Sequence, residues 1–107
     1  MRRAVSQRDL DEIVRRIVEV AQPERIILFG SAARGEMGPN SDVDLLVIKS
    51  GEYDKYALTG AIYKRLHGVG EAVDVIVVTP EEVERYRESP ALVIAPALRE
   101  GRVVYAA

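Results

Sequence analysis

The sequence predicts an α/β protein in which one sheet is covered by helices. Apolar residues repeat at helical spacing near the N-terminus, and three short runs rich in β-branched residues follow at 25–29, 42–49 and 71–78. Such an alternation of helical and strand patterns is typical of α/β folds. The length of 107 residues corresponds to about one domain, so we treat residues 1–107 as a single domain.

The first helix is expected to begin after Ser6. Asp9 follows this serine at the spacing of a capping box. Five apolar residues then fall at helical intervals and predict one buried stripe: Leu10, Ile13, Val14, Ile17 and Val18. Pro23 ends the helix, because proline disfavours helical geometry in the residue before it. The apolar run at 25–29, bounded by Pro23 and Gly30, predicts a buried strand.

The middle of the chain predicts a turn of helix, a loop, a strand and a second long helix. The short helix is expected over residues 31–35, the loop over 35–41 and the strand over 42–49. Residues 52–67 predict the long helix, which stops at Gly68. Its inward positions are expected to be Ala57, Leu58, Ala61, Ile62 and Leu66.

The last third of the chain predicts a strand over residues 71–78, two helices and a short edge strand. A capping box with proline at the first helical position predicts a helix that runs to about residue 87; its residues are Thr79, Pro80 and Glu82. A second helical segment is expected over residues 89–100, with Pro96 kinking or shortening it. Residues 102–105 predict the last strand.

The composition favours a soluble cytoplasmic protein. Fifteen basic and seventeen acidic residues give a net charge of -2, so direct nucleic-acid binding through a basic face is not expected. The absence of cysteine excludes disulfides, cysteine metal ligands and thiol catalysis. No apolar run reaches the ~20 residues of a membrane helix, and the N-terminus lacks the apolar segment of a signal peptide. We therefore expect no membrane contact.

Three aspartates interrupt the predicted strands. Asp42 and Asp44 alternate with valine and therefore share one face of their strand. Two neighbouring carboxylates repel each other unless a cation lies between them, and oxygen ligands suit Mg²⁺ or Mn²⁺. Asp74 stands inside an apolar strand and completes such a site if the two strands are neighbours. The alternatives are an Asp42 that ends a turn and an Asp74 that faces water from an edge strand.

Gly30 and Ser31 follow the first predicted strand. A glycine there lets the backbone approach a ligand, and the amides of a following helix turn, together with the Ser31 hydroxyl, can hold phosphate oxygens. The alternative is a serine that only caps a helix. The stretch is not a P-loop, because no Gly-Lys-Ser or Gly-Lys-Thr follows it.

Gly30-Ser31, ten intervening residues and Asp42-x-Asp44 resemble the signature of the DNA polymerase beta-type nucleotidyltransferase superfamily. The stretch GSAARGEMGPNSDVDLLV, with Asp74 in VDVIVV, is similar to the minimal nucleotidyltransferase (MNT) branch of that superfamily. The similarity covers nearly the whole chain, from the first helix to the closing EGRVVY. It implies the nucleotidyltransferase fold, an αβαβαβ core whose mixed sheet is covered by helices.

The resemblance implies nucleotide transfer from a nucleoside triphosphate with two divalent ions, Mg²⁺ or Mn²⁺. It assigns metal binding and catalysis to three residues: Asp42, Asp44 and Asp74. Asp74 would also help to remove the proton from the attacking hydroxyl, and Gly30 and Ser31 would hold the β- and γ-phosphates. Arg34 follows the SxARG pattern of the family. A phosphate contact and a structural ion pair are both open for Arg34.

The resemblance also implies a partner. Larger members carry a further domain that binds the acceptor, and the roughly thirty residues after residue 78 are too few for one. MNT proteins pair with HEPN-family ribonuclease toxins, and as antitoxins they transfer AMP from ATP to a toxin tyrosine. The alternatives are transfer to a small molecule or nucleic-acid end with a separate substrate-binding subunit, and a non-catalytic antitoxin acting by occlusion. Both homo-oligomers and hetero-oligomers are compatible with the sequence.

Other polar and aromatic residues favour structural roles. His67 stands at a predicted helix end, where the helix dipole favours it over a catalytic base. Three tyrosines on or near one helix suit packing or an interface better than base stacking: Tyr53, Tyr56 and Tyr63. Lys64 and Arg65 are expected to be solvated helix charges rather than triphosphate ligands.

Overall fold

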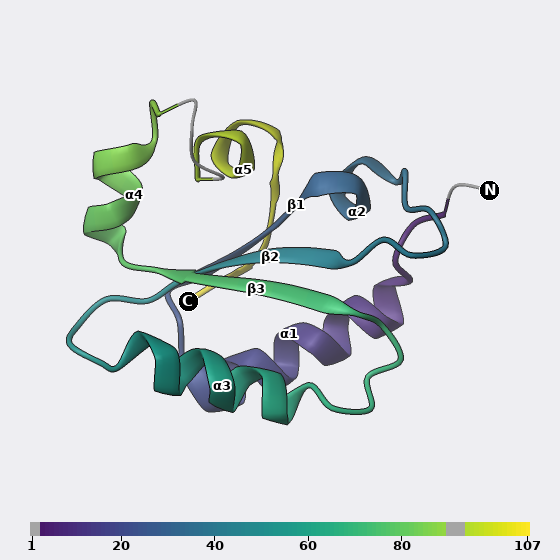
Figure 1. Cartoon of the computed structure of the whole chain (residues 1–107), viewed down its shortest axis with the longest axis horizontal. Coiled ribbons are helices and arrows are strands. Elements are labelled where there is room, and N and C mark those ends of the chain that lie inside the picture. Colours follow the sequence, from purple (N-terminus) through teal and green to yellow (C-terminus); the bar gives the residue numbers. More distant parts are fainter. Residues whose placement is uncertain (1–2, 90–93) are drawn as a thin grey trace.

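The computed structural model describes residues 3–89 and 94–107, which form a four-stranded mixed sheet with helices on both faces (Figure 1). The predicted α/β class is therefore confirmed. In chain order the elements are α1 (Gln7–Ala21), β1 (Arg25–Phe29), α2 (Gly30–Arg34), β2 (Val43–Ile48), α3 (Lys55–Arg65), β3 (Val73–Val78), α4 (Pro80–Tyr86), α5 (Ile94–Glu100) and β4 (Arg102–Ala106).

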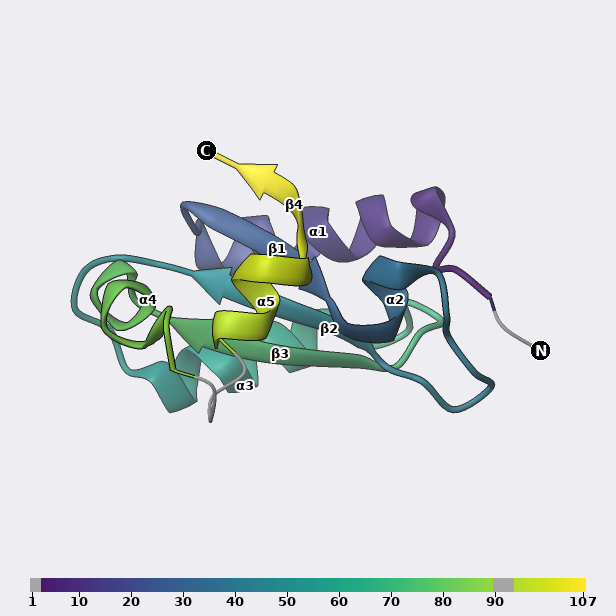
Figure 2. The same cartoon turned by 90° about the horizontal axis from the view of Figure 1, so that it is seen from above.

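The strand order in the sheet is β3-β2-β1-β4. β1 pairs antiparallel with both β2 and β4, whereas β2 and β3 run parallel. The expected edge strand at the C-terminus is therefore present and pairs with the sheet of its own chain. Figure 2 shows β4 at the border of the sheet opposite β3. The register places Phe29 opposite Asp44 and Asp44 opposite Asp74.

One face of the sheet is covered by α1 and α3, which lie side by side beneath the strands in Figure 1. α1 begins where predicted, because the Ser6 hydroxyl accepts a hydrogen bond from the Asp9 N–H at 3.1 Å. Its apolar stripe enters the core, where Ile13 and Ile17 are fully buried. The strand residues that meet the two helices include Ile26, Leu28, Val43, Leu45, Val47, Val75 and Val77.

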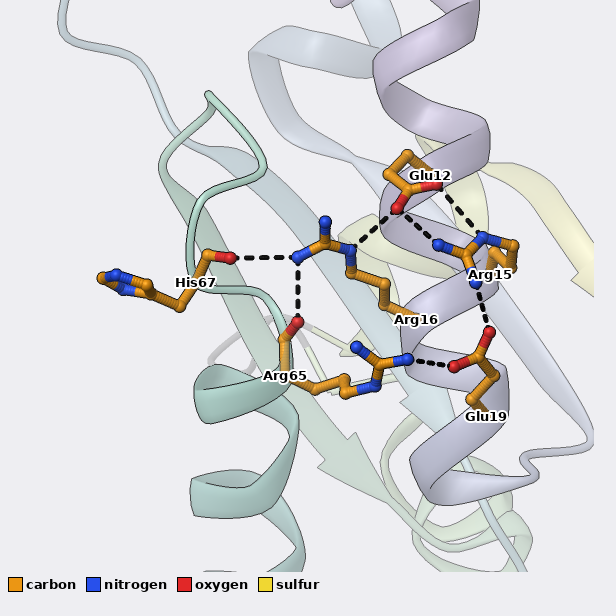
Figure 3. A network of polar contacts seen from close by, with 6 residues as sticks. All are labelled: Glu12, Arg15, Arg16, Glu19, Arg65 and His67. Atoms are coloured by element: carbon orange, nitrogen blue, oxygen red, sulfur yellow. Dashed lines mark hydrogen bonds and ion pairs between the residues drawn. The ribbon is translucent and has the colours of Figure 1, made fainter.

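Charged side chains join α1 to α3 on the outside of this layer (Figure 3). We call this set the ionic network; it consists of Glu12, Arg15, Arg16, Glu19 and Arg65. Arg16 also donates to the main-chain oxygens of Arg65 at 3.1 Å and His67 at 2.9 Å, at the C-terminal end of α3 and just after it. The network therefore satisfies carbonyl groups that a helix C-terminus leaves without partners.

The opposite face of the sheet is covered by α4 and α5 (Figure 2). The predicted capping box of α4 is confirmed: Thr79 Oγ1 accepts from the Glu82 N–H, and the Glu82 carboxylate accepts from the Thr79 N–H. A smaller apolar cluster holds this layer together; it consists of Ile27, Leu46, Ile48, Val78, Ile94 and Ala97.

One predicted detail of the helices is wrong, and another falls partly outside the described residues. Ala57 was expected to face inward but is exposed. It stands five residues before the fully buried Ile62, so it points about 140° away from it around the helix. The segment expected over residues 89–100 falls partly outside the described residues. Pro96 is the third described residue of α5, and the expected effect of this proline on the preceding segment lies outside the described residues.

No helix in residues 3–89 and 94–107 is both long and apolar enough to span a membrane.

Candidate active site

The three predicted aspartates come from two neighbouring strands. Asp44 lies in β2, directly opposite Asp74 in β3, and adjacent strands are about 4.8 Å apart. Asp42 immediately precedes β2, which begins at Val43 rather than at residue 42 as expected. The condition that the sequence left open is therefore met: the strand of Asp74 is the neighbour of the strand of Asp44.

The Asp44 side chain points away from the α1–α3 core. Its neighbours Val43 and Leu45 are fully buried in that core, and alternate side chains of a strand point to opposite faces. The same alternation places Asp74 on the face opposite Val73 and Val75. Asp44 is half-buried, whereas Asp42 and Asp74 are exposed. The carboxylates therefore face an accessible surface near the start of β2 and β3.

The surroundings of Asp44 disfavour its charged form. Burial raises the pKa of Asp44, and the nearby charges of Asp74 and Asp42 raise it further. The Arg34 guanidinium acts in the opposite direction. The ionised form of Asp44 is therefore disfavoured in the protein alone, as expected where like charges gather without a bound cation.

Gly30 joins the first strand to this cluster. Its φ of +71° lies in the left-handed region, which glycine adopts without strain. A Cβ at this position would lie 2.4 Å from Asp44 Oδ2. A side chain at this position would therefore force the Asp44 carboxylate to move.

Ser31 and Arg34 lie in α2, directly after this glycine. Ser31 is half-buried, and no side chain caps the start of α2 at Phe29. Arg34 Nε lies 3.6 Å from Glu36 Oε2, a long ion pair, and its charge also acts on Asp44. Both roles considered for Arg34 remain compatible with this position, and its phosphate contact stays a prediction.

A hydroxyl group that the sequence did not single out contacts the site. Tyr63 of α3 donates from Oη to Asp74 Oδ1 at 3.2 Å and accepts from the Val75 N–H at 2.7 Å. Burial raises the pKa of Tyr63, the Val75 N–H lowers it, and the Asp74 charge raises it. The sequence favours packing or an interface role for this tyrosine over base stacking. The available signal was the position of Tyr63 on the helix that immediately precedes the strand of Asp74.

The three carboxylates are chemically suited to bind a divalent cation. Carboxylate oxygens are the ligands that Mg²⁺ and Mn²⁺ prefer, and a cation would relieve the repulsion that raises the pKa of Asp44. Within the described ranges, no three acidic, histidine or cysteine side chains already converge in a metal-binding geometry. The metal-binding roles of Asp42, Asp44 and Asp74 therefore remain predictions.

The other polar residues considered in the sequence lie outside this cluster. Arg65 belongs to the ionic network through Glu19, and the His67 main chain is bound by Arg16. Tyr53 donates its hydroxyl to the Lys49 carbonyl at 2.8 Å. A cavity of about 480 Å³ lies elsewhere, along β3 beside Lys55 and Tyr86.

Comparison with known proteins identifies the family. The model of the nucleotidyltransferase domain family matches residues 8–103. The chain belongs to the nucleotidyltransferase domain family. The match confirms the nucleotidyltransferase superfamily that the sequence predicts. No curated protein sequence matches the chain.

A solved structure shares the fold of this nucleotidyltransferase domain. It is described as a crystal structure of the toxin-antitoxin MntA-HpeT, in a mutant with two aspartate-to-glutamate substitutions. The match has a TM-score of 0.64 and 16% identity, and it covers 96% of this chain and 75% of the other. At this identity the likeness shows the fold alone, and it confirms the expected nucleotidyltransferase fold.

Proposed function

We propose that this nucleotidyltransferase is an Mg²⁺-dependent enzyme that transfers AMP from ATP to a hydroxyl group of a partner protein. The partner is a HEPN-family toxin, the hydroxyl belongs to a tyrosine, and the enzyme acts as the antitoxin. The observation that carries the proposal is that Asp44 pairs with Asp74 across β2 and β3 and lies against Gly30, within reach of the Asp42 charge.

The residues divide the work of binding and transfer. Gly30 and Ser31 hold the β- and γ-phosphates, and Arg34 adds a positive charge beside them. The carboxylates hold the divalent ions; they are Asp42, Asp44 and Asp74. Bound divalent cations stabilise negative charge on the attacking and leaving oxygens of a displacement at phosphorus. Asp74 also accepts the proton of the acceptor hydroxyl.

The transfer step exchanges one phosphorus–oxygen bond for another. The acceptor oxygen forms a bond to the α-phosphorus of ATP, while the bond from this phosphorus to the bridging oxygen of the β-phosphate breaks. Pyrophosphate leaves with that oxygen. The chain holds the nucleotide and accepts the proton, and no oxidation or reduction takes place.

One comparison supports a protein acceptor. The structure with the shared fold is described as a toxin-antitoxin pair. The two substituted aspartates named in that description are two positions apart, the same spacing as Asp42 and Asp44.

The test is to mix the protein, Mg-ATP and the protein encoded by the neighbouring gene, and to record intact masses. We expect one or more AMP additions on the partner. The additions should disappear in the double variant Asp42→Asn/Asp44→Asn and persist in Asp11→Asn, an acid-to-amide control on the exposed face of α1.

Other outcomes would select another function. Tight binding and toxin inhibition without a mass change, unaffected by the double substitution, would replace transfer by occlusion. AMP on a small molecule or a nucleic-acid end would keep the chemistry and change the acceptor.

A further inference from the structure

Tyr63 reaches the site around the border of the sheet. β3 is the last strand in the sheet order, so one of its two sides lacks a neighbouring strand in the described chain. The carbonyls of Ala72 and Val78 accept hydrogen bonds from the β2 side, from Val43 and Lys49. Val75 differs from Ala72 and Val78 by an odd number of residues, and its N–H therefore points to the open side.

The Tyr63 hydroxyl occupies this open side of β3. It accepts the Val75 N–H at 2.7 Å, the shorter of its two hydrogen bonds. A phenol has one proton to donate and keeps it at neutral pH, where its ordinary pKa is about 10. Because the Val75 N–H is a donor, the hydroxyl proton is directed to its other partner, Asp74 Oδ1 at 3.2 Å. The main chain thus fixes the direction of a hydrogen bond to a site carboxylate.

The bond engages one oxygen of Asp74 and leaves the other available. Among residues 3–89 and 94–107, no other side chain donates a hydrogen bond to Asp74. The carboxylate is exposed, so without Tyr63 no hydrogen bond from a described side chain would select one of its rotamers. The bond to Oδ1 therefore favours one direction for Oδ2.

We infer that Tyr63 is a positioning residue that holds the Asp74 carboxylate ready for its role in nucleotidyl transfer. This inference rests on the proposed function, because it concerns the carboxylate proposed to bind metal and accept the proton. Hydrogen bonds from outer residues orient ligating carboxylates, and their loss costs about 10- to 100-fold in metal affinity or activity. Tyr63 contacts neither nucleotide nor acceptor in this role.

The variant that tests the inference is Tyr63→Phe, which removes one oxygen and keeps the ring. Its matched control is Tyr56→Phe on the same helix. Tyr56 is 89% exposed, and its hydroxyl makes no hydrogen bond within the described chain. Both proteins are first compared with the wild type by amide NMR spectra, so that only folded samples enter the measurements.

The first measurement is Mn²⁺ binding without nucleotide, followed by electron paramagnetic resonance of the free ion. We expect Tyr63→Phe to weaken Mn²⁺ binding about tenfold, although every carboxylate is retained. Asp74→Asn should weaken it at least as much, and Tyr56→Phe should match the wild type. A purely structural role for Tyr63 would change stability and leave the affinity of the folded protein unaltered.

The second measurement separates kcat from KM in AMP transfer to the partner. We expect kcat to fall about tenfold or more in Tyr63→Phe, with KM for Mg-ATP unchanged, because Asp74 acts on the acceptor side. Wild-type Mn²⁺ affinity and kcat in folded Tyr63→Phe would overturn the inference and leave the proposed function standing. A wild-type protein that neither binds Mn²⁺ nor transfers AMP would overturn both.

A third measurement is the intact mass of the enzyme after incubation with Mg-ATP and without the partner. An AMP group found on Tyr63 itself would make this residue an acceptor and would replace the positioning role. The unmodified mass is the result that we expect.

Discussion

The ionic network and the aspartate cluster are both built from exposed or half-buried charges, yet their charges are arranged in opposite ways. In the network, acidic and basic groups of α1 and α3 alternate (Figure 3). Hydrogen bonds from Arg15 and Arg16 lower the pKa of Glu12 to about 2. In the cluster, burial and two neighbouring aspartates raise the pKa of Asp44.

The difference separates charges that hold the fold from charges that need a ligand. Pairing in the network favours the ionised forms that exist at neutral pH, so the protein alone satisfies them. The aspartate cluster is disfavoured in its ionised form until a positive charge arrives. A carboxyl group with a raised pKa, next to a glycine at the end of a strand, is therefore a stronger indication of function than a dense set of ion pairs.

The largest effect is expected for nucleotidyl transfer in Asp42→Asn/Asp44→Asn. Loss of metal-assisted charge stabilisation, which is worth several kcal/mol, should reduce kcat/KM about a thousandfold. The measurement is the rate of AMP transfer to the partner protein. Glu12→Gln is the comparison from the ionic network and should keep the wild-type rate, because Glu12 lies on α1 and pairs with Arg15 and Arg16, away from the aspartates. Equal losses in the two variants would contradict the separation of the clusters.

The next largest effect is expected for Gly30→Ala. A left-handed residue other than glycine costs about 1–2 kcal/mol, and the new methyl would also displace the Asp44 carboxylate from its position. The free energy of unfolding in urea should fall by at least this amount.

Gly60→Ala is the matched control for that substitution. Gly60 lies in the interior of α3, and a Cβ there meets nothing within 4 Å. Alanine should stabilise this helix by about 0.5–1 kcal/mol. A similar loss of stability in both alanine variants would remove the special role of Gly30.

A smaller effect of opposite sign is expected for Asp44→Asn in metal-free protein. Folding raises the pKa of Asp44 above its ordinary 3.8, so the folded state binds more protons than the unfolded state between the two values. Stability therefore falls as pH rises through this window, and the penalty persists at pH 7. The amide variant should be the more stable protein at pH 7, as measured by urea unfolding.

The same titration provides the control for this prediction. The advantage of Asp44→Asn should shrink below pH 3.8, where the wild-type carboxyl is protonated in both states. An advantage that is independent of pH would assign the gain to packing instead of charge.

The smallest effect is expected for Glu12→Gln, and it runs in the opposite direction with pH. The pKa of Glu12 is lowered from 4.5 to about 2 in the folded protein, so its contribution is present above pH 4.5 and is lost as pH falls through 2. Thermal unfolding should show a slightly lower Tm for the variant at pH 7. The difference should shrink at low pH and in high salt, because exposed pairs are screened.

The sequence predicted the elements well where chain signals mark their ends. β1 has the predicted bounds because Pro23 and Gly30 delimit it, and α4 begins at its capping box. The periodicity of α3 was less informative, because alanine fits both faces of a helix, and Ala57 was placed wrongly. The third carboxylate was predicted only on the condition that two strands pair, since strand order is a property of the whole fold.

The contact between Tyr63 and Asp74 was beyond the sequence signals. It depends on how α3 is placed along the length of β3, because that placement brings the Tyr63 hydroxyl level with Asp74 and Val75 at the border of the sheet. Sequence periodicity describes one element at a time and does not predict how two elements are placed relative to each other. The Arg16 contacts with the end of α3 were missed for the same reason.

Because β1 and β2 pair in antiparallel register, the length of the ten-residue connection between Ser31 and Asp42 does not set the geometry of the site. Phe29 pairs directly with Asp44, so the sheet itself sets the distance from Gly30 to the carboxylate. Met37 is buried and bridges to Arg3, which anchors the first half of the connection. The turn around Pro39 and Asn40 is exposed and can change in length without moving the site. Pairing across the strands holds the two ends of the motif together, and the exposed turn between them can be lengthened without separating them.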